Sequence, residues 1–259
     1  MHKITAIIPT FNEAHNIDAV LQSVSWCDEI LVVDSFSTDN TVEKARALAT
    51  KVIQSEYINS ASQKNRAIPQ ATHEWILLVD ADERVTPELK QEIQSLLQQE
   101  RIPCDAYWIH RKNFFMGQEV RFSGWQGDKV IRFFKRDTCR YEEKSVHAEV
   151  TTSGNIGKLR HKLVHNTYKD MMHYMVKWDR YTTWSAQDAY RKGVRPGFFH
   201  YVIKPAFRFF KHYFLQLGIL DGKVGFIISR LNASSVFMRY VKLDGMLIEE
   251  AKRDVNREP

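Results

Sequence analysis

Residues 75–79, Trp-Ile-Leu-Leu-Val, form an unbroken apolar run that leads directly into Asp80 and Asp82. A run of this length between polar segments is typical of a parallel strand that is buried on both faces. Ligands of open α/β sheets bind at the carboxyl ends of such strands. Asp80 and Asp82 would leave an extended chain on the same side, where they can share one hard cation with water and phosphate oxygens. The alternative is a solvated strand end that carries acids without a function.

Strand-like and helical segments alternate over the preceding residues. Strands are expected at 3–9, 29–34, 51–56 and up to Asp80, with helices at 17–24, 41–50, around 63–66 and from Pro87. This alternation predicts an α/β fold with a mostly parallel central sheet and helices on both faces. Between residues 106 and 166, short aromatic and β-branched runs separated by glycine turns predict a mixed or antiparallel extension of that sheet.

Beyond Tyr168 the pattern is helical, with breaks expected at 193–197, at Pro205 and at 220–222. We therefore expect a catalytic domain over residues 1–167 and a helical C-terminal extension over residues 168–259.

Positive charge is concentrated in that extension. The chain carries a net +6, whereas residues 189–243 hold ten basic residues and one acid, a local net of +9. Residues 198–240 also contain eleven aromatic side chains, which predicts amphipathic helices on an anionic membrane surface. The alternatives are a subdomain core with a solvated basic face, or nucleic-acid binding, which is not expected because no nucleic-acid-binding motif is present.

Several classes of protein are not supported. The first strand is not followed by Gly-x-Gly-x-x-Gly, and no Gly-Lys-Ser/Thr phosphate loop occurs. Cys27, Cys104 and Cys139 lack metal-ligand spacing and are expected to be reduced thiols of a cytosolic protein. We expect neither a signal peptide nor a spanning helix, which needs about 18–20 uncharged apolar residues.

Four successive motifs resemble those of family 2 glycosyltransferases with the GT-A fold. They are residues 9–13 (Pro-Thr-Phe-Asn-Glu), 32–41 (Val-Val-Asp-Ser-Phe-Ser-Thr-Asp-Asn-Thr), 63–67 (Gln-Lys-Asn-Arg-Ala) and 80–82 (Asp-Ala-Asp). The resemblance continues through residues 124–134, 146–149 and 218–222, and it is strongest to bacterial lipopolysaccharide-core glucosyltransferases.

The resemblance implies a nucleotide-sugar site. Pro9, Thr10 and Glu13 would border the nucleotide, and Asp34 would accept a hydrogen bond from the base, typically uracil. Lys64 and Arg66 would lie near the base and diphosphate, and Asp80 and Asp82 would hold Mg²⁺ or Mn²⁺. His165 would complete the shell of the metal or diphosphate, the alternative being a hydrogen-bonded structural residue. The Gln-x-x-Arg-Trp motif of processive enzymes is absent, so one sugar per acceptor is expected.

An inverting transfer also needs a base for the acceptor hydroxyl. Asp128, in a glycine-containing turn before a strand, is the first candidate and Glu149 the second; the alternative for Asp128 is a turn-forming residue without a chemical role. Trp125 is expected either to stack on a sugar or to be a core aromatic.

Together these expectations describe a metal-dependent, inverting, non-processive hexosyltransferase. It would use a UDP-sugar, with UDP-glucose expected, at the cytoplasmic face of the inner membrane as a peripheral protein. Its acceptor would be a lipid-anchored glycan such as lipopolysaccharide inner core; polyprenyl-phosphate or protein acceptors are alternatives. From another class, the chain would be a catalytically silent scaffold with the same fold, although the presence of both Asp80 and Asp82 argues against that.

Overall fold

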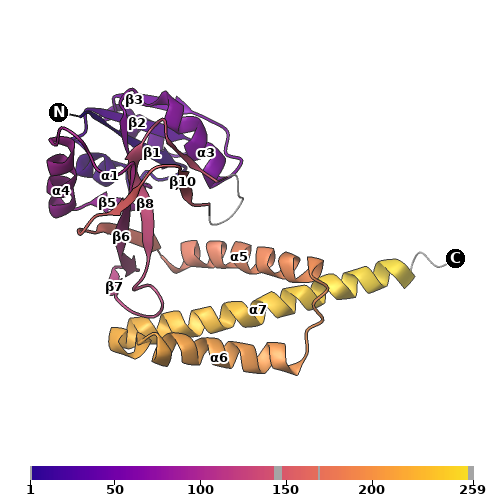
Figure 1. The fold of residues 1–259 in the computed structure, drawn as a ribbon. Coiled ribbons are helices and arrows are strands. Elements are labelled where there is room, and N and C mark those ends of the chain that lie inside the picture. Colours follow the sequence, from indigo (N-terminus) through magenta and orange to yellow (C-terminus); the bar gives the residue numbers. More distant parts are fainter. Residues whose placement is uncertain (1, 143–147, 169, 256–259) are drawn as a thin grey trace. The chain divides into compact units, whose positions relative to one another are not determined.

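The computed structural model of this chain describes residues 2–142, 148–168 and 170–255 (Figure 1). Their contacts divide the described chain into two compact units. The sheet unit comprises residues 1–112 and 128–165, and the helical unit comprises residues 113–127 and 166–259. The functional division at residue 167 stays a prediction.

Strands β3-β2-β1-β4-β8-β6-β12-β5, in this order, form the central sheet of the described residues, and β11 and β7 each pair with β6. Their bounds are β1 Ile4–Thr10, β2 Glu29–Asp34, β3 Lys51–Gln54, β4 Trp75–Leu78, β5 Glu83–Val85, β6 Ala106–Phe115, β7 Gln118–Val120, β8 Lys129–Lys135, β11 Ile156–Lys158 and β12 Leu163–Tyr168. Strands β9 (Cys139–Tyr141) and β10 (Val150–Thr152) pair separately and antiparallel.

The N-terminal half of the sheet is parallel and buried on both faces. Strand β1 pairs in parallel with β2 and β4, and β2 pairs with β3. Successive residues of β1 enter different clusters: Ile8 packs with helices α1 (Ile17–Ser23) and α4 (Pro87–Leu97), and Ile7 packs with α3 (Ser60–Ala67). Helix α2 (Thr41–Arg46) contributes Ala45 to the first of these clusters. Alternating side chains of β1 are therefore buried on the two faces of the sheet, as the apolar runs predict.

Beyond β4 the sheet is mainly antiparallel. Strand β8 runs antiparallel to both β4 and β6, and β12 runs antiparallel to β5. In this register Phe133 lies opposite Leu77, and Arg111 donates its backbone N–H to the Asp128 carbonyl at 3.0 Å. The mixed extension expected from the sequence is thus present, and it brings β4, β8, β6 and β12 side by side.

The helical unit contains α5 (Met171–Arg191), α6 (Lys204–Phe210) and α7 (Gly222–Val255). Breaks are found after α5 and at residues 216–222, but not at Pro205. Pro205 lies in the first turn of α6, directly after a π-helical segment, Phe199–Ile203, so its missing N–H interrupts nothing. Among the described helices, none is long and apolar enough to cross a membrane.

Candidate functional site

The carboxyl ends of β1 and β2 form one side of the candidate site. Thr10 ends β1 and is buried, and its hydroxyl has no hydrogen-bond partner among the described residues. Pro9 precedes it on the same buried strand. The backbone N–H of Ser35 donates to the Thr10 carbonyl at 2.9 Å, which ties the two loops together. A buried hydroxyl without a partner is costly, so Thr10 provides an unused polar group at the strand end.

Asp34 ends β2 and is fully buried. Its carboxylate accepts hydrogen bonds from the Ser37 N–H at 2.9 Å, from the Ser37 hydroxyl and from the Gln54 amide at 3.1 Å. Since an ionised carboxylate has about four acceptor positions, one position remains for a further donor. The loop that follows is strained at Phe36, which is exposed and has a φ of 59°.

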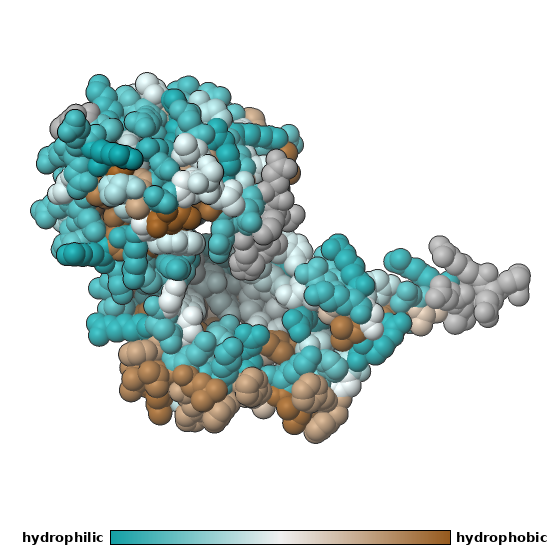
Figure 2. Space-filling model, in the orientation of Figure 1, coloured by the Kyte–Doolittle hydropathy of each residue, from teal (hydrophilic) through white to brown (hydrophobic). Residues whose placement is uncertain are grey.

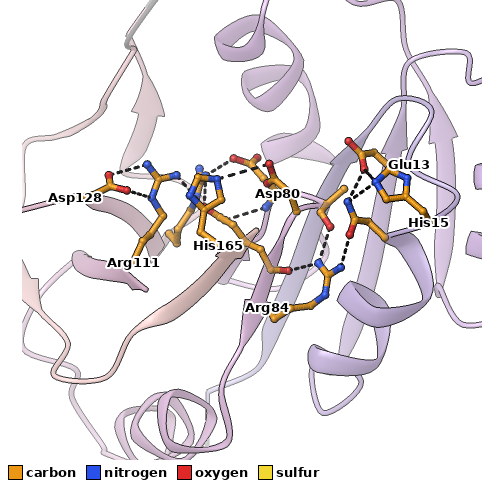
Figure 3. A network of polar contacts seen from close by, with 12 residues as sticks. Glu13, His15, Asp80, Arg84, Arg111, Asp128 and His165 are labelled. Atoms are coloured by element: carbon orange, nitrogen blue, oxygen red, sulfur yellow. Dashed lines mark hydrogen bonds and ion pairs between the residues drawn. The ribbon is translucent and has the colours of Figure 1, made fainter. Parts of the chain in front are cut away.

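Glu13 and Arg84 connect the first loop to the acidic one. The Glu13 carboxylate accepts from the Asn16 amide at 2.8 Å, and Arg84 donates to the Asn16 side-chain oxygen at 2.7 Å. Arg84 also donates to the carbonyls of Ala81 and Glu83 at 2.6 and 2.7 Å, which fixes the turn that carries Asp82. Figure 3 shows Arg84 between Glu13 and the Asp80 loop.

Asp80 lies between two cations. Its carboxylate forms ion pairs with Lys64 of α3 at 3.0 Å and with the buried Arg132 of β8. Burial raises the pKa of Asp80, but the charges of Arg132 and Lys64 outweigh it and hold the pKa well below the usual range of an aspartate. Asp80 is therefore ionised and fixed in position at neutral pH.

The network continues along neighbouring strands to the predicted base. The fully buried Glu83 accepts from Arg132 at 2.9 and 3.0 Å and pairs with Arg111 at 3.3 Å. Arg111 of β6 also donates two hydrogen bonds to Asp128, at 2.7 and 2.9 Å. This bidentate pair, visible in Figure 3, raises the pKa of Arg111 against the lowering effect of burial. Arg111 thus orients the Asp128 carboxylate, and the role of Asp128 as a base stays a prediction.

Asp82 has a different partner from Asp80. The extended strand ends at Leu78 and the chain turns at Ala81–Asp82, so the period-two argument does not hold here. Because β12 pairs with β5, His165 lies opposite Glu83, and its Nε2 is 3.6 Å from Asp82 Oδ2. No group of three acids, histidines or cysteines in the described residues is placed to hold a metal by itself.

The remaining predicted residues lie elsewhere. Arg66 is exposed on α3, and its guanidinium donates to the Glu56 carbonyl at 3.4 Å. Glu149 is exposed, and its carbonyl accepts from the Glu142 N–H at 2.9 Å. Trp125 belongs to the helical unit, and its ring packs edge-on against Phe115 at 6.5 Å. His147, part of one resemblance motif, lies outside the described residues.

Sequence reasoning did not assign site roles to Arg132, Glu83, Arg111 and Arg84. The signal for Arg132 was available, because it interrupts the apolar run Val130-Ile131-Arg132-Phe133-Phe134 at a position that proves buried. A charge inside such a run requires a buried partner. Which acid provides it depends on strand order, which the local pattern does not contain.

Comparison with known proteins agrees with the motifs. The model of the family "Glycosyl transferase family 2" matches residues 5–154. An uncharacterised glycosyltransferase of Rickettsia felis is 27% identical, with 96% of this chain and 92% of that protein covered. The lipopolysaccharide core biosynthesis glycosyltransferase LpsC of Rhizobium meliloti is 24% identical, with 92% and 93% covered. The solved structure of Staphylococcus aureus TarS has a TM-score of 0.46 and 20% identity, with 64% of this chain and 37% of that chain covered.

The family match spans more than half of the chain and includes all four N-terminal motifs and the loops that hold Thr10, Asp34 and Asp80. The α/β architecture with a mixed central sheet agrees with the GT-A fold expected from those motifs. This chain is a member of glycosyltransferase family 2.

Proposed function

We propose that this protein is a metal-dependent, inverting, non-processive hexosyltransferase. It moves one sugar, glucose from UDP-glucose, to a lipid-anchored glycan such as the inner core of lipopolysaccharide. The observation that carries this proposal is the contact of Asp82 with His165, beside an Asp80 held by Lys64 and Arg132, within a family 2 chain.

The donor binds at the carboxyl ends of β1, β2 and β4. Asp34 has an acceptor position left for the N–H of a uracil ring, and Thr10 offers its unpartnered hydroxyl. Lys64 is a cation next to the acidic turn, suited to a phosphate oxygen. Arg66 is exposed and outside this cluster, so we give it at most a peripheral role.

Asp82 and His165 suit Mg²⁺ or Mn²⁺ as a carboxylate and an imidazole ligand whose side-chain atoms lie 3.6 Å apart. Two protein ligands are few, and a diphosphate and water would fill the other positions. The oxygens of Asp80 already accept from Lys64 and Arg132, so Asp80 fits less well as a direct ligand. When bound, the metal would act as a Lewis acid on the charge that develops on the leaving diphosphate.

Asp128 acts as the base. Arg111 orients its carboxylate through two hydrogen bonds. The acceptor oxygen forms a bond to the anomeric carbon as the bond to the diphosphate breaks, UDP leaves, and the hydroxyl proton passes to Asp128. Glu149 lacks this orientation by a cation in the described network and serves as the control.

The lipid-anchored acceptor is supported by an exposed apolar surface on the helical unit. Figure 2 shows hydrophobic atoms gathered along the region of α6. They include Phe198, Phe207, Phe210, Phe214 and Leu215, which are 46–74% exposed. These side chains lie outside the core of the unit, whereas Tyr240, another of the eleven aromatic residues, belongs to it. With the local charge of +9, this amphipathic surface suits an anionic membrane interface. We expect no nucleic acid as partner.

A thermal-shift screen tests the donor assignment. UDP-, GDP-, CMP- and ADP-sugars are each added with and without Mn²⁺. We expect stabilisation by UDP-hexoses in the presence of metal, with loss of the metal effect in Asp82→Asn. Absence of a shift with every nucleotide, in a folded sample, would favour the scaffold alternative.

The acceptor assignment is tested by transfer from radiolabelled UDP-glucose to lipopolysaccharide inner core, to polyprenyl phosphate and to protein. Label in the inner core supports the proposal. Label only in polyprenyl phosphate or protein replaces the acceptor while leaving the donor assignment intact.

A further inference from the structure

The helical unit encloses a cavity of about 310 Å³. Two helices supply most of its wall. From α5 come Tyr174, Trp178, Tyr181, Thr182 and Ser185, and from α7 come Ile228, Leu231, Asn232, Ser235, Val236 and Arg239. Both sets repeat at intervals of three and four residues, so each is one face of its helix. Two such faces would normally fill the space between them, and the open volume is therefore a feature of this unit.

Aromatic rings form one part of the wall. The residues that line the cavity and are described here include Phe115, Trp125, Tyr168, Tyr174, Trp178 and Tyr181. Phe115 packs edge-on against Tyr168 and Tyr174 at 5.6 Å each, which fixes the ring orientations. Flat apolar surfaces of this kind accept the C–H face of a sugar ring and keep their own geometry.

Two of the lining residues carry polar donors that lack partners. The indole N–H of Trp178 and the Nε–H of Arg239 are buried, and neither has a hydrogen-bond acceptor within the described part of the chain. A buried donor without an acceptor is costly, so both sites favour a ligand that brings acceptor oxygens. A hydrocarbon chain would leave these donors unsatisfied.

The cavity is also positively charged. Arg208 and Arg239 line it, no Asp or Glu is among its described lining residues, and neither arginine pairs with a carboxylate in the described structure. Thr182, Ser185, Asn232 and Ser235 add hydroxyl and amide groups to the wall. Arginines of this kind recognise phosphate or carboxylate groups by paired hydrogen bonds.

We propose that this cavity binds one anionic sugar unit, a sugar ring that carries a phosphate or carboxylate group. The volume is at the lower end of the range of about 300–1,000 Å³ for ligand pockets, which suits a single unit better than an extended glycan. Resting on the proposed function, we assign this unit to the acceptor. Trp125, predicted to stack on a sugar, would do so here, and only two residues separate it from Asp128 in the sequence.

Ligand-observed NMR on the full chain tests the site directly, without turnover. The probes are glucose 6-phosphate, glucuronate, glucose, inorganic phosphate and octanoate. We expect at least one of the two anionic sugars, glucose 6-phosphate or glucuronate, to bind. It should bind more tightly than glucose and more tightly than inorganic phosphate. If octanoate binds most tightly, the cavity is a lipid site. If glucose binds as tightly as the anionic sugars, the arginines do not recognise the anion. If the folded protein binds no sugar, the proposal is overturned.

Variants locate the binding. Arg239→Gln should weaken the anionic sugar by about tenfold or more, the effect of a lost hydrogen bond to a charged group. Trp178→Phe keeps an aromatic ring and removes the N–H, so it should also weaken binding, and it provides a second test if Arg239→Gln folds poorly. The matched control is Arg230→Gln on the same helix, outside the cavity lining, which should bind normally.

UDP binding separates this proposal from the donor assignment. In Arg239→Gln and Trp178→Phe it should equal that of the parent protein, because both residues belong to the helical unit. If the parent protein does not bind UDP, the donor assignment is refuted, and the NMR result on the sugar probes still stands. If both variants bind the sugar as the parent protein does, the cavity is not the binding site.

Discussion

The two units differ in how their charged side chains are paired. In the sheet unit, acids and cations are joined inside the protein: Asp80, Glu83 and Asp128 share Arg132, Arg111 and Lys64. In the helical unit, Arg208 and Arg239 line a cavity without a carboxylate partner in the described residues. A paired network stabilises a fixed geometry, whereas cations without a carboxylate partner can bind an external anion. The first arrangement suits a preorganised donor site and the second suits recognition of an acceptor.

The largest effect is expected from breaking the buried network. Glu83→Gln should destabilise the protein by about 3–5 kcal/mol, because it leaves Arg132 and Arg111 short of a buried partner. The matched change in the helical unit is Asp179→Asn, which breaks an exposed pair with Lys242 and should cost less than about 1 kcal/mol. Urea unfolding measures both. Equal losses would contradict the contrast between the units.

Asp80→Asn should lower stability by about 2 kcal/mol at neutral pH, in a pH-dependent way. Arg132 and Lys64 depress the pKa of Asp80 in the folded state, so its contribution is present above the unfolded value of about 3.9 and is lost as pH falls through the folded value. The stability gap between parent and variant should therefore close as the pH falls from about 5 toward 2. A gap that stays constant over this range would show that the Asp80 charge is not involved.

The exposed phenylalanines of the helical unit should contribute to membrane binding and little to the stability of the fold. The double variant Phe207→Ser with Phe210→Ser should change stability by only about 0.5 kcal/mol, since both rings are largely exposed. It should strongly reduce co-sedimentation with vesicles that contain anionic lipid, in a salt-dependent way. Phe36→Ser, at a similarly exposed ring in the sheet unit, is the control. If co-sedimentation of the parent protein depends on neither lipid charge nor salt, the proposed membrane surface is refuted.

A small stability effect is also expected at Thr10. Thr10→Val removes a buried hydroxyl that has no partner in the described structure, so unfolding should change by less than about 1 kcal/mol. UDP affinity should nevertheless fall, because the ligand loses a hydrogen bond. Isothermal titration with UDP and Mn²⁺ measures this, and unchanged affinity would remove Thr10 from the site.

Local patterns predicted most of the fold. Strand β2 has the predicted bounds, and β6 and β8 lie in the region where short strands were predicted, because apolar runs reflect burial directly. Strands β5, β9 and β11 were missed, since three residues are too few for a periodic signal. Pro205 was wrongly taken as a break, because the sequence does not reveal that this residue falls in the first turn of a helix.

The site was predicted in part, for a related reason. Motifs identified Asp80 and Lys64, which the structure joins in one ion pair. Arg132 is 52 residues from Asp80 along the chain, and its role depends on β8 lying beside β4. The proposed roles of Asp34, Asp82, Asp128 and His165 stay predictions until ligand and activity measurements are made.

The most direct test of the account is UDP release from UDP-glucose in the presence of lipid-anchored inner-core acceptor. The parent protein should be active with Mn²⁺ or Mg²⁺, and Asp82→Asn should lose at least about 100-fold, the scale of one lost electrostatic contact to a developing charge. Asp179→Asn, far along the chain in the helical unit, should remain active. Full activity of Asp82→Asn, or equal activity after removal of metal with chelator, would contradict the account.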